Sequence, residues 1–501
     1  MKLIKSVGII TLIAIVSKLL GFGRELLMAA YFGASTVTDA FFVASIIPVL
    51  MFTAVGMAIT TGMAPLYAES KGKNEVISVL ASMFFLLSVG LTIVFYLLTP
   101  VITKIMAPGF SEAENQLTNQ LTVIMLPSFC FFVLSAIMTG ILEYERVFAP
   151  PAFVAIPQNL FVILALIFLT NRYGIYGIAF ATLLGAVSQF LIQYPFIKKY
   201  HILRVHFAFK KHKKQLVDTL KMFSPIVIAS VAYQVNAVVD RMVASRLPAG
   251  SVSALNYANK LMFLPLSILL LSLITVLFPS IVDAAMSRGT EFVRLVLKGL
   301  SLISFAAIPI LVVMLVESKL LVSLAFERGA FDETAARMTS LAFFFYSFGM
   351  VFIALKEFLN RCFVALKETK ATMMSSVLSV VVNIVLSILL SLWMGVGGIA
   401  LATSVAMALQ TVLLFYRLPA AVRIEKTDLV AFSRGVVKLL ILFLIVYGLT
   451  WFAAFLPINN SFLHLVFISI VAFVLFAVGA IILKCHEVLA FRQIIKSRRK
   501  D

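Results

Sequence analysis

Long apolar runs constrain the fold of this chain more than any other feature. The 501 residues are 62% hydrophobic and only 13% charged. A helix needs about 20 consecutive, mostly apolar residues to cross the hydrocarbon of a bilayer, and such runs occur about fourteen times between short polar or Pro/Gly-rich breaks. The pattern predicts an all-α polytopic membrane protein of about 14 transmembrane helices. The expected spans are 7–31, 38–67, 75–102, 118–143, 150–170, 174–197, 219–245, 252–282, 295–317, 335–364, 371–393, 396–416, 431–456 and 463–484.

The distribution of positive charge predicts how these helices are oriented. The chain carries a net charge of +19, and roughly 30 of its 41 Lys and Arg residues fall in the termini and in alternate loops. The positive-inside rule explains this excess without a nucleic-acid partner and makes both termini cytoplasmic, which requires an even number of crossings. The first apolar run has no small-residue cleavage site after it, so we expect a retained helix and not a signal peptide.

An internal repeat divides the chain into two similar halves. GIYGIAFAT at 174–182 matches GVGGIALAT at 395–403, and Asn159 matches Asn383 at nearly the same offset. Six helices separate the copies, so both halves have the same orientation in the membrane. This parallel repeat is a known plan of transporters, in which the substrate site lies between the halves.

The repeat predicts the domain organisation. We expect a first six-helix lobe, a basic linker on the cytoplasmic side, a second six-helix lobe, and two additional helices followed by a basic cytoplasmic tail. The respective boundaries are 1–200, 201–218, 219–418 and 419–501. The basic segment 198–214 is expected to lie on anionic headgroups.

Ionisable residues interrupt the first two apolar runs. Lys18, Arg24 and Glu25 fall inside the first run, and Asp39 falls at the start of the second. Each costs about 2.5–3.5 kcal/mol at the centre of a membrane helix, so such residues persist where they face a water-filled cavity, a partner charge or a charged substrate. Snorkelling to the interface is the alternative. Lys18 lies too deep in its run for that, so we expect it to face a cavity.

The second half has its own charges at membrane depth. Asp240 and Arg241 are as compatible with an interfacial position as with a buried one, and Lys356 and Glu357 are expected to have structural partners. Lys260 is apolar-bounded on one side and flanked by asparagines on the other, which is typical of a residue that faces a polar cavity.

The candidate substrate-binding set is therefore Lys18, Arg24, Glu25, Asp39 and Lys260. Its cations outnumber its acids, and Lys and Arg bind phosphate oxygens through charge-assisted hydrogen bonds, so the pattern predicts transport of an anion, possibly a phosphorylated one. The sequence has no GxxxxGK[ST] loop, so the membrane potential, an ion gradient or downhill flux is the expected energy source. The three cysteines have no paired spacing, which argues against a disulfide framework or a cysteine metal site.

Several segments resemble the MurJ lipid II flippases, a family within the superfamily that also contains polysaccharide flippases and multidrug antiporters. They are SKLLGFGRELLMAAYFGASTVTDAFFVASIIP at 17–48, VVDRMVASRLPAGSVSALNYANKLMFLP at 238–265 and LAFERGAFDETA at 324–335. The resemblance implies two six-helix lobes around a central cavity, alternating access, and a lipid groove built with the last two helices. It also implies a role in peptidoglycan synthesis and cell-wall biogenesis, at the bacterial inner membrane.

The implied substrate is lipid II, the undecaprenyl-pyrophosphate-linked peptidoglycan precursor, moved from the cytoplasmic to the outer leaflet. Arg24 and Asp39 match the family unchanged, whereas Lys18 and Lys260 stand where it usually has arginine. The family often has a further arginine after the segment that ends in Pro48, where this chain has no cation. That departure favours the alternative, a flippase for another polyprenyl-linked saccharide such as a capsule, exopolysaccharide or teichuronic-type precursor.

Some members of the family carry a sodium site, and Asp240, Asn383 and Thr403 correspond to three of its ligands, with Ser387 in place of an expected acid. No other cofactor is implied, and the implied partners are the lipid substrate, membrane lipids and cell-wall synthesis proteins. A membrane glycosyltransferase or ligase would need a carboxylate on the outer face. The available carboxylates, Glu317, Glu327, Asp332 and Glu333, are expected to lie in a solvated loop, so we do not expect an enzyme.

Overall fold

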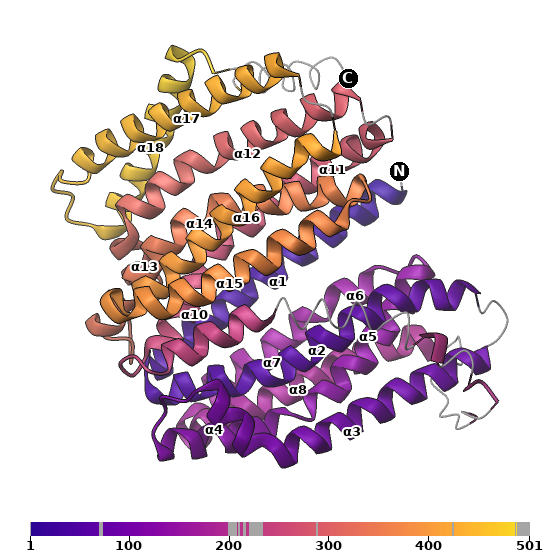
Figure 1. Cartoon of the computed structure of the whole chain (residues 1–501). Helices are drawn as coiled ribbons and strands as arrows, with labels where there is room; N and C mark the ends of the chain where they lie inside the picture. The colour runs from indigo at the N-terminus through magenta and orange to yellow at the C-terminus, as the bar shows by residue number, and fades with distance from the viewer. Residues whose placement is uncertain are drawn as a thin grey trace. The chain divides into compact units, whose positions relative to one another are not determined.

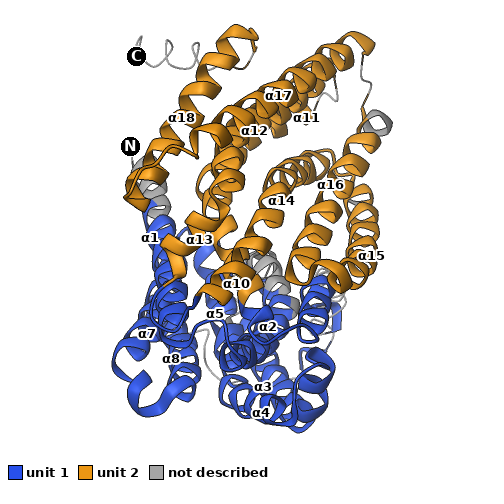
Figure 2. Cartoon of the chain, turned by 90° about the vertical axis from the view of Figure 1, so that its left-hand side faces the viewer, with its two compact units in different colours: residues 1–253, 328–332 blue, residues 254–327, 333–501 orange. Residues whose placement is uncertain are grey.

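The computed structural model describes residues 2–69, 74–198, 208, 211–213, 217–219, 234–286, 289–422, 425–485 and 487. Every regular element among these residues is helical, as the apolar runs predict. The chain forms two compact units, one of residues 1–253 and 328–332 and the other of residues 254–327 and 333–501 (Figure 2). The short segment 328–332 of unit 1 therefore comes from far along the chain.

Unit 1 contains eight named helices, and residues 234–244 are helical as well. Long helices run alongside one another within it (Figure 1), with α2 against α5, α7 against α8 and α1 against α7. Its helices are α1 (Lys2–Phe32), α2 (Thr36–Glu69), α3 (Asn74–Met106), α4 (Glu112–Met125), α5 (Ser128–Tyr144), α6 (Ala149–Phe153), α7 (Ala155–Phe168) and α8 (Thr170–Lys198).

Unit 2 pairs α14 with α16 and α15 with α16, and it packs α12 against α14 and α17. Only the first three residues of α10 belong to unit 1. The helices are α10 (Ser251–Pro265), the π-helix η1 (Leu266–Leu270), α11 (Leu271–Ala285), α12 (Thr290–Val316), α13 (Ser318–Phe326), α14 (Glu333–Ala365), α15 (Thr369–Met394), α16 (Val396–Ala421), α17 (Lys426–Ala453) and α18 (Ser461–Ile482).

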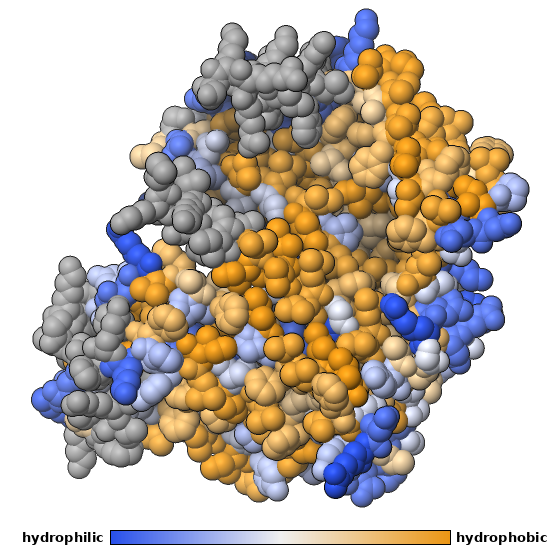
Figure 3. Space-filling model, turned by 180° about the vertical axis from the view of Figure 1, so that it is seen from behind, coloured by the Kyte–Doolittle hydropathy of each residue, from blue (hydrophilic) through white to orange (hydrophobic). Residues whose placement is uncertain are grey.

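Twelve spans in the described residues are long and apolar enough to cross a membrane. The 31-residue α1 is long enough to cross as well, and residues 234–244 form a helical part of the predicted helix 219–245. The helix content therefore agrees with the predicted count of about 14. Apolar side chains cover most of the face in Figure 3, and strongly hydrophilic ones lie mainly at its margins, as expected where helices face lipid.

Local sequence explains where the longer spans break. Ser111 and Glu114 form a reciprocal capping box that begins α4. Pro265 ends α10, and a π-helical turn follows before α11, because proline removes one backbone donor and disturbs the hydrogen-bond ladder. Gly174 has a φ of 52° and a ψ of −139°, which kinks α8 within the segment predicted to begin a new span there.

Backbone conformation supports the internal repeat. Three pairs of residues with positive φ recur at nearly the same spacing along the chain: Gly33 with Gly250, Arg146 with Lys367, and Gly174 with Gly395. Gly174 and Gly395 also share an unusual ψ, −139° and −130°. Residues with positive φ are uncommon, so their recurrence in register shows that the two halves bend at equivalent points.

The two helices beyond the repeat pack into unit 2 through an apolar cluster on α12, α17 and α18. Val312, Leu442 and Ala472 are fully buried in it, and the rings of Phe305 and Phe476 lie 4.6 Å apart. The nine-residue α13 lies between α12 and α14. The lobe boundaries stay a prediction, and most of the basic linker and the basic tail lie outside the described residues.

Candidate functional site

The first membrane charges lie along α1. Lys18 is one residue from the middle of this helix, and its side chain is exposed. Arg24 Nη2 donates to Glu25 Oε1 at 2.6 Å, and the Arg24 side chain is 28% exposed, whereas that of Glu25 is 3% exposed. Glu25 thus neutralises part of the charge of Arg24 from its buried side, and the guanidinium keeps an accessible face for a further anion.

Helix α1 packs against α7 beside these charges. A Cβ at Gly21 would lie 3.6 Å from Nδ2 of Asn159, the buried amide on α7 that the repeat analysis identified. Asn159 Nδ2 donates to Ala155 O at 2.9 Å and to Ser17 O at 3.4 Å. Asn159 therefore fixes the part of α1 that carries Lys18. Gly23 has open space around it, so it does not mediate a close approach.

Asp39 is 3% exposed, and both of its carboxylate oxygens accept hydrogen bonds. Oδ2 accepts from Gly250 N at 2.8 Å, and Oδ1 accepts from Ser253 N at 2.7 Å and Ser253 Oγ at 2.6 Å. The carboxylate on α2 therefore caps the first turn of α10, as an N-cap side chain would, although it comes from a distant part of the sequence. No pattern of residues indicated this partnership.

Lys260 lies in the second unit, nine residues after the first residue of α10, and its side chain is exposed. At a rise of 1.5 Å per residue, it is about 13 Å from the start of α10. Arg24 precedes the last residue of α1 by eight positions, or about 12 Å. Each cation thus lies well inside its own helix.

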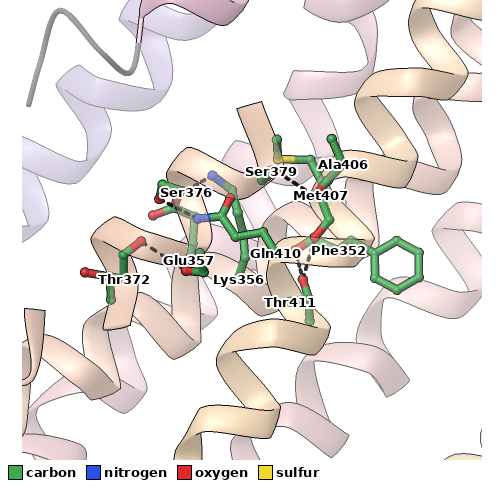
Figure 4. A network of polar contacts seen from close by, with 11 residues as sticks. Phe352, Lys356, Glu357, Thr372, Ser376, Ser379, Ala406, Met407, Gln410 and Thr411 are labelled. Carbon is green, nitrogen blue, oxygen red and sulfur yellow. Dashed lines mark hydrogen bonds and ion pairs between the residues drawn. The ribbon is translucent and has the colours of Figure 1, made fainter. Parts of the chain in front are cut away.

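Lys356 and Glu357 belong to a polar network between α14, α15 and α16. Lys356, 4% exposed, forms an ion pair with Glu357 at 3.2 Å. Gln410 Nε2 donates to Ser376 Oγ at 2.7 Å, and Figure 4 shows all four side chains gathered at one place. The expected structural role of Lys356 and Glu357 agrees with this pairing.

The residues proposed for sodium are divided between the two units. Asn383 is fully buried and donates from Nδ2 to Thr403 Oγ1 at 3.2 Å. Its Oδ1 has no hydrogen-bond partner among the described residues, whereas Thr403 Oγ1 also donates to Ile399 O. Asp240 belongs to unit 1 and is half-buried, beside Arg241, whose Nη1 donates to Ala237 O at 2.8 Å. No described group of three or more His, Cys, Asp or Glu residues could hold a metal.

One carboxylate lies in a different environment from the one that we expected. Glu317 was expected in a solvated loop, but it is 7% exposed and lies 3.2 Å from Nε2 of His464 at the start of α18. The expectation was wrong because the first turn of α18 covers this carboxylate. Charge pattern alone could not reveal the pairing, since the two residues are far apart in sequence.

Comparisons with known proteins agree across nearly the whole chain. The family model described as "Lipid II flippase MurJ" matches residues 28–477. A "Probable lipid II flippase MurJ" from Buchnera aphidicola subsp. Schizaphis graminum is 30% identical over 435 residues, which cover 83% of each chain. A "Lipid II flippase MurJ" from Burkholderia cenocepacia is 28% identical over 435 residues, again covering 83% of each chain.

Solved structures give the same result. A structure described as "Lipid II flippase MurJ, inward closed conformation" superposes with a TM-score of 0.83 at 26% identity and covers 97% of this chain and 99% of its own. An inward-facing multidrug resistance MATE transporter shares the fold, with a TM-score of 0.68 at 15% identity over 81% of this chain and 95% of its own. Its fold, its repeat and the family match over residues 28–477 show that the chain is a multi-pass membrane protein that belongs to the lipid II flippase MurJ family.

Proposed function

We propose that the chain moves lipid II from the cytoplasmic to the outer leaflet of the bacterial inner membrane by alternating access, without breaking a covalent bond. The observation that carries the proposal is the placement of Lys18, Arg24 and Lys260 deep within membrane helices of a chain of this family. Such charges are costly in a membrane unless a polar cavity or an anionic ligand compensates them. The positive loop charge supports cytoplasmic termini.

In this proposal, the diphosphate of the substrate contacts Lys18, Arg24 and Lys260. Arg24 offers its guanidinium donors on the side that Glu25 does not occupy, and the two lysines act as point charges. Glu25 and Asp39 have positioning roles. Glu25 orients Arg24, and Asp39 holds the start of the helix that carries Lys260.

Complementation of a strain depleted of its own lipid II flippase tests the proposal. We expect the wild-type chain to restore growth, and Arg24→Ala and Lys260→Ala, at normal membrane levels, to abolish rescue. Lys211→Ala is the matched control, because Lys211 is 66% exposed and its ion pair with Glu75 lies at the surface, where such pairs contribute little. Full rescue by both cavity variants would overturn the assignment.

A second candidate is a flippase for another polyprenyl-linked saccharide. The observation that favours it is the absence of a cation in VLMFTAVGMA, residues 49–58 of α2, after Pro48. If the wild-type chain fails to rescue lipid II translocation but restores export of a capsule or teichuronic-type precursor, this candidate replaces the first. Wild-type rescue of lipid II translocation decides against it.

We also propose that sodium or the membrane potential supplies the energy. The free Oδ1 of buried Asn383 supports a sodium site, because sodium takes oxygen ligands and a buried carbonyl oxygen without a donor is unfavourable. Thr403 and Asp240 would supply further oxygens. Thermal unfolding of the detergent-purified protein in NaCl and in KCl tests the site. Stabilisation by sodium that Asn383→Ala removes would support it, and equal unfolding temperatures in both salts would refute it.

A further inference from the structure

The first turns of α8 carry exposed polar and aromatic side chains that have no part in the proposed central site. Tyr173 is 50% exposed, and Tyr176 is 42% exposed. The guanidinium carbon of Arg172 lies 5.4 Å from the centre of the Tyr173 ring, and the Arg172 side chain is exposed as well. The other end of α8 is Lys198, where the basic segment begins, so the end with the tyrosines faces outward in the proposed orientation.

Helix α4 adds amide side chains to the same surface of unit 1. It lies against α8, and the hydroxyl of Tyr176 donates to Oε1 of Gln120. Gln116 precedes Gln120 by about one turn, and both amides are exposed. The hydrogen bond orients the Tyr176 ring beside amides that can still donate and accept. We call Gln116, Gln120, Arg172, Tyr173 and Tyr176 the tyrosine–amide patch.

The second half has different side chains at the equivalent positions. The spacing that relates Gly174 to Gly395 also relates Gln120 to Leu341, Tyr176 to Gly397 and Arg172 to Trp393. A Cβ on Gly397 would lie 2.9 Å from Cγ of Leu341, so α14 and α16 meet there through an apolar side chain. Trp393 is 88% exposed, which is typical of an aromatic residue at a membrane interface. An aromatic belt alone therefore does not account for the amides and the arginine of the first half.

The chemistry of the patch fits the headgroup of a saccharide that a diphosphate links to a lipid. Sugar rings place the C–H groups of one face against aromatic rings, and their hydroxyl and acetamido groups exchange hydrogen bonds with amides. A guanidinium binds phosphate oxygens through charge-assisted hydrogen bonds. The positive-inside rule explains the cations on the cytoplasmic side, whereas Arg172 lies on the opposite side.

The patch also lies at the depth of such a headgroup. Gln120 and Tyr176 fall just inside the ends of the predicted spans 118–143 and 174–197. Phe180 and Leu184 follow Tyr176 at intervals of about one turn, and both are exposed. An isoprenoid tail along this apolar face of α8 would place its diphosphate and its sugars at the patch.

We infer that the tyrosine–amide patch is a second binding site for the transported lipid, at the outer edge of unit 1. Arg172 binds the diphosphate, and the tyrosines and amides contact the sugars. The inference rests on the proposed function and orientation, and the site consists of other residues than the proposed central cations. In the outer leaflet, it retains the delivered precursor beside the protein.

Binding to the full chain in lipid nanodiscs tests the site. Arg24→Ala with Lys260→Ala removes two central cations, and this variant is titrated with lipid II. We expect saturable residual binding that Arg172→Ala or Tyr176→Ala weakens about 5- to 30-fold, because one lost charge-assisted hydrogen bond or aromatic contact has an effect of about that size. Trp393→Ala is the matched control, since it removes an exposed aromatic side chain from the equivalent position of the second half.

The controls separate the site from simpler roles. Equal weakening by Trp393→Ala would show that these residues only anchor the protein in the membrane, and it would overturn the site. Undecaprenyl diphosphate without sugars and phosphatidylglycerol are the competing probes. If either competes as strongly as lipid II, the patch recognises phosphate alone and the saccharide site is overturned. Absence of residual binding would overturn it as well.

Photocrosslinking gives a second test that does not depend on the alanine variants. Gln116 is replaced by p-benzoylphenylalanine in the otherwise unchanged chain, in cells grown with radiolabelled N-acetylglucosamine. Ultraviolet light should attach labelled lipid-linked saccharide at position 116, and the same replacement of Trp393 should capture much less. No adduct at position 116, or equal adducts at both positions, would refute the site. Failure of the wild-type chain to rescue the flippase-depleted strain would instead refute the proposed function.

Discussion

Replacing Asp39 with alanine should destabilise the protein through the start of α10. The substitution leaves Gly250 N and Ser253 N without the acceptors that they have at 2.8 Å and 2.7 Å, in a position where Asp39 is only 3% exposed. A buried donor without a partner costs about 1–3 kcal/mol, so two such donors cost about 2–6 kcal/mol. This exceeds the cost of about 0.5–2 kcal/mol for losing an ordinary N-cap.

The measurement is thermal unfolding of purified protein in one detergent, followed by intrinsic fluorescence. Asp39→Ala should lower the unfolding temperature clearly, and Asp39→Asn should lower it less, because the amide keeps one carbonyl oxygen that accepts a hydrogen bond. Ser253→Ala removes only the hydroxyl donor and should have the smallest effect. An unfolding temperature of Asp39→Ala equal to that of the wild type would show that the carboxylate does not hold α10, and our reasoning would fail.

Three further predictions follow from the same structure. Gly174→Ala and Gly395→Ala should each destabilise the protein by a similar amount, about 1–3 kcal/mol, because both positions have a backbone conformation unsuited to a side chain; unfolding in denaturant measures this. His464→Ala should lower the unfolding temperature because it leaves Glu317 buried without its partner, and Glu317→Gln should restore part of the loss in the double variant. Burial raises the pKa of the Cys485 thiol, so in a variant without the other cysteines maleimide labelling should be slow at neutral pH and should accelerate as the pH rises through the alkaline range.

Hydrophobic pattern predicted the helices well because membrane helices need long apolar runs. The predicted span 371–393 corresponds to α15 at Thr369–Met394, and 463–484 corresponds to α18 at Ser461–Ile482. The breaks within spans were missed. Residues 252–282 were expected as one helix, but a π-helical turn follows Pro265. The hydropathy averaged over the span is the same with or without such a turn, so the apolar pattern could not reveal it.

The candidate site was only partly predictable. The ion pair between Arg24 and Glu25 joins neighbours in sequence, so the motif itself could suggest it. The partners of Asp39 lie more than 200 positions away in the sequence. They are backbone N–H groups, which donate whatever the residue type, so no sequence pattern identifies them. Gly33, Gly250 and Gly329 are visible as residues, but their positive φ and their close carbonyl neighbours depend on contacts with distant parts of the chain.

The repeat also shows which charges the fold does not require. The spacing that relates Arg146 to Lys367 also relates Ser135 to Lys356. In the first half, Ser135 Oγ accepts from Gln193 Nε2 at 2.6 Å, so neutral side chains are sufficient to join these helices.

The second half has an ion pair at the equivalent position, in which the side chain of Lys356 is 5% exposed and that of Glu357 is 38% exposed, and burying a charge carries a desolvation cost that neutral groups avoid. The same half contains Asn383, with its free carbonyl oxygen. In the first half the equivalent Asn159 donates to backbone carbonyls of α1 and α7, whereas the free Oδ1 of Asn383 supports the sodium dependence that we propose for the second half. Asn383→Ala should therefore alter the dependence on cations, whereas Ser135→Ala should affect stability alone.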